Sequence, residues 1–310
     1  MTETILSRIG NTSILPLRKI VPASGARILL KLEHENPTGS LKDRMALAMV
    51  EAAERDGRLP PGGAVVEYTG GSTGVSLALV CAVKGHPLHI VSSDAFAREK
   101  LDHMRLLGAK LTLVESDGGR MTAKLTRDMI ERARGIAADT GGFWSDQLNN
   151  ADQLDAYTAL AEEIWAQTGG CIDGFVQAVG TAAAFRGTTE ALKRKHSDLM
   201  AVAVEPAESA VLSGGAPGGH KIDGVGAGFV VPLWREGVAD RIEQVSTKEA
   251  RAMVLRLARE EGLFAGTSTG ANVIAALRLA ETLPAGATVV TLLCDTGMKY
   301  LKGWSELFDA

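Results

Sequence analysis

The chain alternates short apolar runs, rich in β-branched residues, with longer stretches in which apolar residues recur every three or four positions. The short runs predict β-strands and the longer stretches predict amphipathic helices. We expect strands at residues 28–32, 64–68, 88–91, 111–114, 175–179, 201–204 and 288–293. We expect helices at residues 40–56, 73–84, 98–107, 124–138, 151–168, 185–195, 248–260 and 269–283. This alternation predicts an α/β fold on mainly parallel sheets that are covered on both faces.

Length and composition extend this picture to two domains. A chain of 310 residues is longer than the chains that usually fold around a single hydrophobic core. Hydrophobic residues make up 45% and charged residues 23%, which is typical of a soluble globular protein. We expect an N-terminal α/β domain at residues 1–145 and a C-terminal one at residues 146–310, with a segment at roughly 10–35 that crosses to the other domain.

Charge and cysteine usage exclude several classes of function. The net charge is −4 and no basic block is present, so we expect no nucleic-acid or membrane partner. The three cysteines, Cys81, Cys171 and Cys294, are far apart and form no CxxC pair, which argues against a metal site and indicates a reducing compartment. No apolar run reaches the roughly 20 residues of a membrane span. The first residues lack a signal-peptide pattern, so we expect a cytoplasmic protein.

The stretch Asn-Pro-Thr-Gly-Ser-Leu-Lys-Asp-Arg at residues 36–44 carries the first candidate chemistry. Pro37 and Gly39 break the chain after the expected strand at 28–32, and Ser40 is placed as a helix N-cap. Lys42 then falls in the first turn, where the helix dipole disfavours a cation and lowers the amine pKa. A neutral lysine amine forms a Schiff base with a carbonyl compound. The alternative is a solvated surface lysine.

Two further loops rich in glycine and small residues join an expected strand to an expected helix. Residues 67–74 read Glu-Tyr-Thr-Gly-Gly-Ser-Thr-Gly, and residues 179–184 read Val-Gly-Thr-Ala-Ala-Ala with Arg186 one turn later. Backbone N–H groups at the start of a helix favour an anion, and the second loop suits a phosphate. The alternatives are an ordinary strand–helix turn for the first loop and close helix–strand packing for the second.

Two more segments, a glycine-rich stretch and the end of the last strand, are candidates for lining a ligand site. Residues 221–229 contain a G-x-G-x-G spacing, but no strand precedes it and Val230-Val231-Pro232 follows in place of a helix. We therefore reject a dinucleotide site and expect a tight loop that lines a pocket. Cys294-Asp295-Thr296-Gly297 ends the last strand, where a hydroxyl either meets a ring nitrogen or belongs to a simple turn.

Together these segments resemble the cysteine synthase (O-acetylserine sulfhydrylase) and cystathionine β-synthase family of pyridoxal-phosphate enzymes. The likeness runs from residues 9–12, Ile-Gly-Asn-Thr, through residues 205–209 to residues 295–297. Residues 36–44 are the most specific match, and the other segments are specific mainly in combination. The resemblance implies pyridoxal 5′-phosphate as cofactor and fold type II (tryptophan synthase β-like), with two α/β domains, each a mainly parallel sheet flanked by helices.

The same resemblance implies roles for individual residues. Lys42 is the expected catalytic residue and holds the cofactor covalently. The other expected cofactor-binding residues face the 3′-oxygen, the phosphate and the pyridine nitrogen: Ser72, Gly180, Thr181, Ala182, Ala183, Ala184 and Thr296. The expected substrate-binding residues hold the amino-acid carboxylate: Thr69, Gly70, Gly71, Thr73 and Gln147. The N-terminal domain then carries the lysine and the carboxylate loop, and the C-terminal domain carries the phosphate loop.

Seven positions depart from the family pattern, among them Ala182 and Ala183, where the family's phosphate loop usually has glycine. Tyr68, Gly70 and Ser72 stand where the family usually has proline, serine and asparagine. Gly70 therefore lacks a hydroxyl, and Ser72 is short enough that its contact with the cofactor needs a water. Ala184 replaces a threonine of the phosphate loop, whereas Thr296 replaces a serine and keeps the hydroxyl.

The reaction that the resemblance implies is β-replacement. The freed Lys42 amine removes the α-proton of the amino acid, and a hydroxyl at the pyridine nitrogen favours loss of a β-substituent over transamination. An activated serine derivative then reacts with sulfide or another thiol to give L-cysteine or an analogue. One alternative is β-elimination, as in serine or threonine dehydratases and cysteine desulfhydrases, which would release pyruvate and ammonia. Another is a catalytically idle protein that binds the cofactor and a partner.

The departures also suggest a substrate preference. Because Gly70 and Ser72 are small, we expect a roomier floor of the carboxylate pocket with fewer donors, with Tyr68 either filling part of that space or turning away. We therefore expect O-phosphoserine to be used better than O-acetylserine, with Arg186 either assisting the anion or belonging to the helix after the phosphate loop. The resemblance also implies a homodimer.

Overall fold

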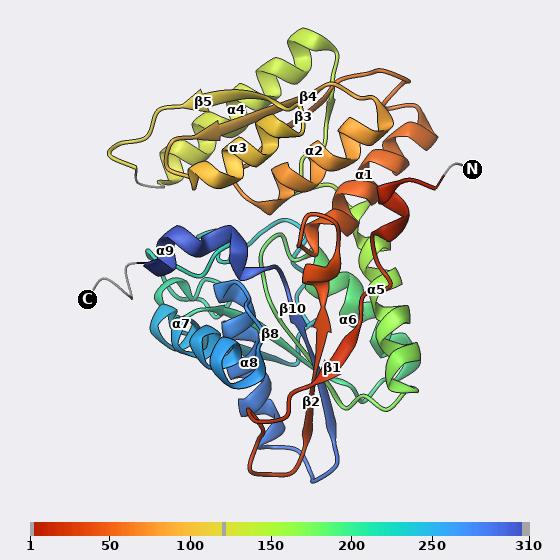
Figure 1. Ribbon diagram of the computed structural model, residues 1–310, viewed down its shortest axis with the longest axis vertical. Helices are drawn as coiled ribbons and strands as arrows, with labels where there is room; N and C mark the ends of the chain where they lie inside the picture. The colour runs from red at the N-terminus through yellow and green to blue at the C-terminus, as the bar shows by residue number, and fades with distance from the viewer. Residues whose placement is uncertain (1–2, 120–121, 306–310) are drawn as a thin grey trace. The chain divides into compact units, whose positions relative to one another are not determined.

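The computed structural model describes residues 3–119 and 122–305, and this part of the chain forms two compact units (Figure 1). The first unit combines the segment before Gly10 with Asn36–Gln153. The second unit combines Gly10–Glu35 with the chain from Leu154 onward. The main chain thus changes units after residue 153, where the sequence led us to expect residue 145.

The first unit is built on a four-stranded sheet in the order β5-β4-β3-β6, in which every pairing is parallel. Its strands are β3 (Val65–Tyr68), β4 (Leu88–Ser93), β5 (Lys110–Val114) and β6 (Phe143–Trp144). Its helices are η1 (Ile5–Arg8), α1 (Lys42–Asp56), α2 (Ser72–Lys84), α3 (Arg98–Leu106) and α4 (Ala123–Thr140). Since the strands run in parallel, the loops at their carboxyl ends emerge along one edge.

The two faces of this sheet are covered by different helices. α2 and α3 advance the chain from β3 to β5, whereas α4 returns it to β6, so right-handed crossovers place α4 on the opposite face. On that face, Val66 and Val91 pack with Leu125, Met129 and Ala133 of α4. Successive strand residues point to opposite faces, so the residues next to Val66 and Val91 in sequence face α2 and α3.

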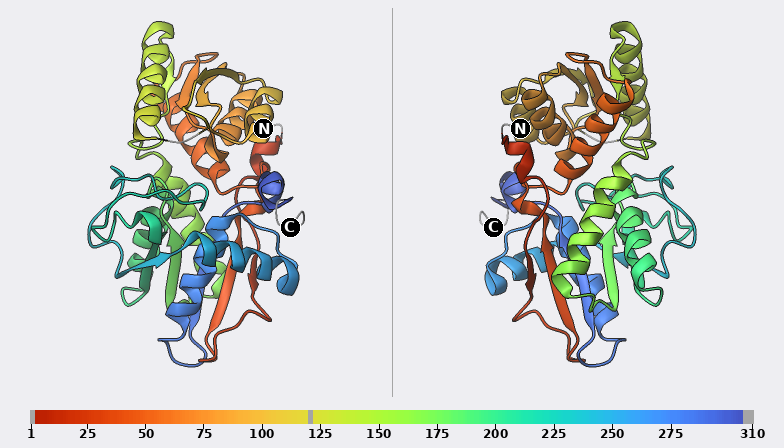
Figure 2. Two further views of the ribbon diagram at one scale, coloured as in Figure 1. Left: turned by 90° about the vertical axis from the view of Figure 1, so that its left-hand side faces the viewer. Right: turned by 90° about the vertical axis from the view of Figure 1, so that its right-hand side faces the viewer.

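The second unit is built on one sheet, which Figure 2 shows from two sides. The sheet has six strands in the order β1-β2-β10-β7-β8-β9. Only the edge pair β1–β2 is antiparallel, and the other pairs are parallel. Its strands are β1 (Ile14–Pro16), β2 (Arg27–Leu32), β7 (Gly174–Ala178), β8 (Met200–Pro206), β9 (Arg241–Val245) and β10 (Thr288–Leu293). Its helical segments are η2 (Glu33–Glu35), α6 (Ala183–Lys195), η3 (Ala207–Ser209), α7 (Thr247–Arg256), η4 (Leu257–Glu261), α8 (Thr267–Ala280), η5 (Gly297–Tyr300) and α9 (Leu301–Ser305). Helix α5 (Gln153–Thr168) leads into this unit from the first.

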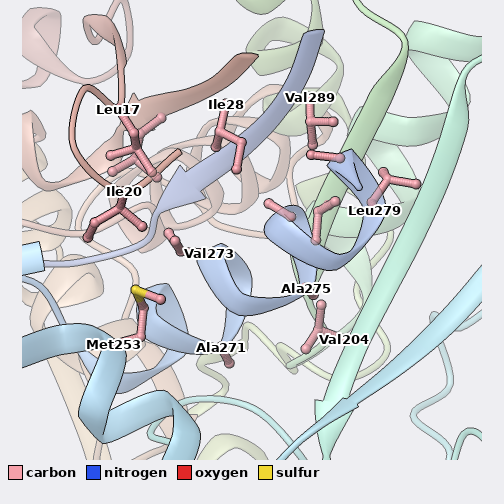
Figure 3. Packing of buried hydrophobic residues seen from close by; sticks show 14 of the residues in the cluster. Leu17, Ile20, Ile28, Val204, Met253, Ala271, Val273, Ala275, Leu279 and Val289 are labelled. Carbon is pink, nitrogen blue, oxygen red and sulfur yellow. The ribbon is translucent and has the colours of Figure 1, made fainter. Parts of the chain in front are cut away.

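The core of the second unit is an apolar cluster around α8 (Figure 3). Ala271, Ala275 and Leu279 recur at four-residue spacing, so they lie along one face of the helix. All three are buried, together with Val204 of β8 and Val289 of β10. The two alanines keep the helix close to the sheet, which places its N-terminus beside the strand ends.

The predicted fold class is confirmed, because the chain forms mainly parallel sheets flanked by helices. All seven expected strands are present within two residues of their predicted ends, but β1, β6 and β9 were not predicted. β9 has the sequence Arg-Ile-Glu-Gln-Val and is an edge strand, so it lacks the continuous apolar run of a buried strand. Among the described residues, no helix is long and apolar enough to span a membrane.

Candidate active site

Lys42 is the first residue of α1 and is half-buried. The prediction that it lies in the first turn of a helix is confirmed, but the N-cap position is occupied by Leu41, not by Ser40. The Ser40 hydroxyl instead accepts the Lys42 N–H, at 3.2 Å. The expected preceding strand, β2, lies in the second unit, so Lys42 does not directly follow a strand of its own sheet.

A buried carboxylate next to Lys42 fixes the loop before the helix. Asp43 is completely buried and accepts hydrogen bonds from the Thr38 N–H (2.7 Å) and the Thr38 hydroxyl (2.5 Å). It also accepts the Ser76 hydroxyl of α2, at 2.6 Å. These bonds connect the start of α1 to α2, the helix that follows the Thr69–Thr73 segment. Lys42 is therefore presented from a fixed helix terminus.

The structure brings the expected substrate loop and Gln147 together. The Thr73 hydroxyl donates to Oε1 of Gln147 at 2.8 Å, and Nε2 of Gln147 donates to the Tyr68 carbonyl at 3.0 Å. The Gly71 N–H donates to the Thr69 hydroxyl at 3.1 Å, which shapes the turn before α2. Ser72 is the first residue of that helix. Thr69, Thr73 and Gln147 are each buried, so the loop is closed on itself and held by side chains.

The expected free space at Gly70 is not present. A Cβ atom placed on Gly70 would lie 1.8 Å from Cγ of Phe96, whereas ordinary contacts begin at 3.4 Å. The Phe96 ring, from the segment between β4 and α3, thus fills the volume of any side chain at position 70. Tyr68 packs against the same apolar cluster as Phe96. The prediction of a roomier pocket floor is wrong at Gly70, and it gives no reason to expect O-phosphoserine.

In the second unit, the expected phosphate loop joins β7 to α6. Ala182 is the N-cap of α6 and has a φ of +69°, an uncommon value for alanine that turns the chain sharply into the helix. The next residues, Ala183 and Ala184, open the helix with small buried side chains. A Cβ on Gly180 would lie 2.5 Å from the Gly224 carbonyl, so only glycine fits there. With Thr181, this loop offers N–H groups and little side-chain bulk, which suits a phosphate ester.

The glycine-rich segment at 221–229 packs directly on this loop. The Gly226 N–H donates to the Val179 carbonyl at 3.1 Å. Gly180, Gly226 and Phe229 line one pocket of the second unit. This cavity has a volume of about 10 Å³, room for about one water molecule, so the expected loop lining a ligand pocket stays a prediction. Arg186 pairs with Glu190 at 3.0 Å and donates to the Leu233 carbonyl, so its guanidinium already has partners within α6 and in the segment before β9.

Thr296 lies at the end of β10 and is half-buried. Its hydroxyl accepts the Met298 N–H at 3.3 Å and caps the short helix η5. A β-bridge between Ala265 and Thr296 holds the chain before α8 against this strand end. The Thr269 hydroxyl accepts the Cys294 N–H at 3.1 Å. The first turn of α8 is therefore anchored beside Thr296.

This first turn contains a candidate that sequence reasoning missed. Ser268 is a buried residue whose hydroxyl has no hydrogen-bond partner in the part of the chain that the structure describes. The residue keeps 6% of its surface exposed, and its hydroxyl oxygen is not among the fully enclosed polar atoms, so a ligand group can reach it. The signal was the run Gly-Thr-Ser-Thr-Gly at residues 266–270. It resembles the other loops in composition, but it follows no expected strand.

Glu67 is a second residue that the motifs did not single out. It is completely buried near the end of β3, and burial raises the pKa of its carboxyl group to about 7. Its place immediately before the substrate loop was visible in the sequence, but its burial was not. Among the described residues, no cluster of histidine, cysteine, aspartate or glutamate has an arrangement that could hold a metal ion.

Several known proteins are similar to this chain in sequence and in fold. A cysteine synthase from Staphylococcus aureus is 37% identical over 309 residues, which cover 99% of this chain and 98% of the relative. The crystal structure of a cysteine synthase (OASS) from Entamoeba histolytica matches with a TM-score of 0.93 and 35% identity, covering 100% of this chain and 91% of that one. That of an O-ureido-L-serine synthase matches with a TM-score of 0.92 and 34% identity, covering 100% and 96%.

The resemblance to cysteine synthases and the fold type II architecture are thereby confirmed. The model of one family matches residues 5–295, nearly the whole chain. The chain belongs to this family, the pyridoxal-phosphate dependent enzymes.

Proposed function

We propose that this enzyme catalyses β-replacement on an activated serine derivative, with sulfide or another thiol as nucleophile, and produces L-cysteine or an analogue. The observation that carries the proposal is the closed pair formed by the Thr69–Thr73 segment and Gln147, linked through the Thr73 hydroxyl at 2.8 Å. Two donors beside this bond, the Thr69 hydroxyl hydrogen and the second Nε2–H of Gln147, have no acceptor among the described residues and can donate to an amino-acid carboxylate. The cysteine synthase from Staphylococcus aureus, which matches along its whole length, supports the same reaction.

Each residue has a proposed task in this reaction. When bound, pyridoxal phosphate supplies the electron sink that lets an amino acid lose its α-proton and its β-substituent. Lys42 binds the cofactor covalently and then moves the α-proton with its freed amine. The Thr69–Thr73 segment and Gln147 orient the amino acid by its carboxylate. Ser72 faces the 3′-oxygen, and residues 180–184 hold the phosphate mainly through backbone N–H groups.

A hydroxyl at the pyridine nitrogen completes the proposal. Thr296 was predicted for this position, and it remains a candidate. Ser268 is favoured, because its hydroxyl has no partner among the described residues and can turn freely, whereas the Thr296 hydroxyl is held at η5 by the Met298 N–H and keeps only its hydrogen to donate. A hydroxyl donor at this nitrogen leaves the ring neutral and favours loss of the β-substituent.

Two experiments test the function. Purified enzyme is mixed with sulfide and with O-acetylserine, O-phosphoserine or serine, and cysteine, pyruvate and ammonia are quantified with and without sulfide. Cysteine that forms only with sulfide is the expected result, whereas equal pyruvate and ammonia without sulfide would assign β-elimination. Borohydride reduction followed by peptide mapping should place the cofactor mass on Lys42. Its appearance on another lysine would overturn the assignment of Lys42.

We also propose that the enzyme works in the cytoplasm as a homodimer, as the resemblance implies. Light scattering on the eluting peak of a gel-filtration column measures the mass directly. A mass near twice the 32.6 kDa of one chain is expected.

A further inference from the structure

Glu67 connects two loops at the carboxyl edge of the first unit's sheet. Its Oε1 accepts the Tyr68 N–H at 2.9 Å. Its Oε2 accepts the Ser145 hydroxyl at 2.8 Å and the Gln147 N–H at 3.0 Å. One carboxylate therefore binds both the strand that leads into the substrate loop and the segment after β6.

The bond to the Gln147 N–H determines where the Gln147 side chain is held. That side chain is bonded at both ends, to the Thr73 hydroxyl and to the Tyr68 carbonyl. The preceding residue, Asp146, has a φ of +44°, a left-handed conformation that is costly for a residue other than glycine. Such a conformation persists only where its surroundings hold it. Glu67 supplies one of the bonds that hold this turn.

We propose that Glu67 is a positioning residue for the amino-acid substrate: its negative charge holds Gln147 against the Thr69–Thr73 segment, and loss of that charge weakens binding of the substrate carboxylate. The inference rests on the proposed function, in which this segment and Gln147 bind that carboxylate. It assigns Glu67 a role through Gln147, with no contact to substrate or cofactor.

The chemistry of the carboxyl group explains why its charge matters. As a carboxylate, Glu67 accepts three hydrogen bonds, each of them assisted by the charge. When protonated, it carries an O–H that needs an acceptor. The Ser145 hydroxyl can take that role, because it also lies 3.2 Å from the Val66 carbonyl and can donate there instead. The N–H groups of Tyr68 and Gln147 then face a neutral acceptor, and charge-assisted bonds are roughly twice as strong as neutral ones.

The surroundings bring this change of charge into the range of neutral pH. Burial raises the pKa of Glu67 to about 7, and the negative charge of Asp146 acts in the same direction. The hydrogen bonds from Ser145, Gln147 and Tyr68 oppose the shift without cancelling it. The Tyr68 phenol, whose own pKa is raised by burial, stays neutral throughout this range.

The neighbouring elements contribute other titratable groups. β4 pairs Ile90 with Glu67 and places its histidine, His89, opposite Val66 instead. On α2, the titratable groups are Cys81, whose pKa is raised, and Lys84, which pairs with glutamates of α1. Both lie in the last turn of α2, whereas Glu67 precedes the first. The charged residues of α4 belong to the helix on the opposite face of the sheet.

The test measures binding of a non-reacting amino acid to the holoenzyme by the change in cofactor absorbance. L-Alanine carries the α-carboxylate and no leaving group, and ethylamine is the matched probe without a carboxylate. In the wild type, the Kd of L-alanine relative to that of ethylamine should rise about fivefold to tenfold from pH 8 to pH 6. In Glu67→Gln this ratio should be about tenfold higher at pH 8 and should no longer depend on pH, as expected when charge-assisted bonds are lost. Glu67→Asp should restore part of the pH dependence.

Glu261→Gln is the matched control. The Glu261 carboxylate also accepts backbone N–H groups, from Arg18, Lys19 and Ile20 in the second unit. Its replacement should leave the ratio and its pH dependence unchanged. If Glu67→Gln binds both probes like the wild type at pH 8 and keeps the same pH profile, Glu67 does not position the loop.

Hydrogen exchange of the wild type covers the case in which the variant fails to fold. The protection factor of the Gln147 N–H against local opening, in which this bond breaks while Glu67 stays buried, should fall as the pH is lowered through 7. Constant protection would overturn the proposal. If the holoenzyme binds no amino acid at any pH while this protection still changes, the proposed function fails and the link between Glu67 and Gln147 stands.

Discussion

Adding a single methyl group at Gly70 should destabilise the first unit, because the Phe96 ring already fills that volume. The added Cβ would lie 1.8, 2.0 and 2.4 Å from three carbons of the ring, which is at least 1 Å inside the 3.4 Å where ordinary contact begins. Either the ring or the loop must therefore move by more than 1 Å. Overpacking of this kind costs about 1–3 kcal/mol.

Gly71 provides a matched control in the same loop. A Cβ at Gly71 would meet only the Thr69 hydroxyl oxygen, at 4.0 Å, and neither glycine has a positive φ. Gly71→Ala should therefore change the free energy of unfolding by no more than about 0.5 kcal/mol, the usual range away from packed sites. Urea unfolding of both variants, followed by a spectroscopic signal of the first unit, measures the difference.

A double-mutant cycle identifies Phe96 as the cause. Phe96→Ala removes the ring, so Gly70→Ala should cost about 1–3 kcal/mol less in that background than in the wild type. Additivity within about 0.5 kcal/mol would refute the steric explanation. Equal costs for Gly70→Ala and Gly71→Ala would refute it as well. Activity with O-acetylserine in the four variants then shows whether the ring also shapes the substrate pocket.

Three other predictions concern the cofactor and the buried carboxyl group. Thr181→Ala should weaken pyridoxal-phosphate affinity by about 1.5–3 kcal/mol, roughly 10-fold to 150-fold, as measured by equilibrium titration. Unchanged affinity would mean that its hydroxyl does not meet the phosphate. Ser268→Ala should shift the cofactor absorbance and lower kcat more than Thr296→Val does. The opposite order would indicate that Thr296, and not Ser268, contacts the pyridine nitrogen. The raised pKa of Glu67, from 4.5 to about 7, favours the protonated form in the folded state, so its stabilising effect is complete below pH 4.5 and lost as the pH rises through 7. Relative to Glu67→Gln, the wild type should lose about 3 kcal/mol of unfolding free energy between pH 4.5 and pH 8, and parallel pH profiles would contradict this.

The sequence predicted the buried strands well, because both faces of each are covered and their composition is continuously apolar. It predicted edge elements poorly. β6 has only two residues, β1 has three and ends at Pro16, and three of the five residues of β9 are polar. Edge strands need less burial and so carry a weaker pattern.

The site was predictable where a glycine or a hydroxyl residue follows a strand. It was not predictable where a residue distant in sequence determines the packing around the site. The loops at Gly70 and Gly180 were found as expected. The ring that fills the space at Gly70 comes from Phe96, 26 positions later, and no local pattern links the two. Ser268 was missed because the chain just before α8 is held at the strand edge by the bridge between Ala265 and Thr296, which is a tertiary contact.

The pairing of β2 with β10 sets an order on the synthesis of this protein. Arg27 of β2 lies opposite Thr288 of β10. One of the first strands to leave the ribosome therefore cannot form this pairing until one of the last strands has been synthesised. The first unit needs no residue beyond Gln153 and can fold while translation continues. Until β10 has been synthesised, β2 has only the short β1 as a neighbour, and its other edge is open to pairing with strands of other proteins. The nascent chain is therefore exposed to aggregation through β2 for most of its synthesis, and a chaperone that binds extended apolar segments would find its target there.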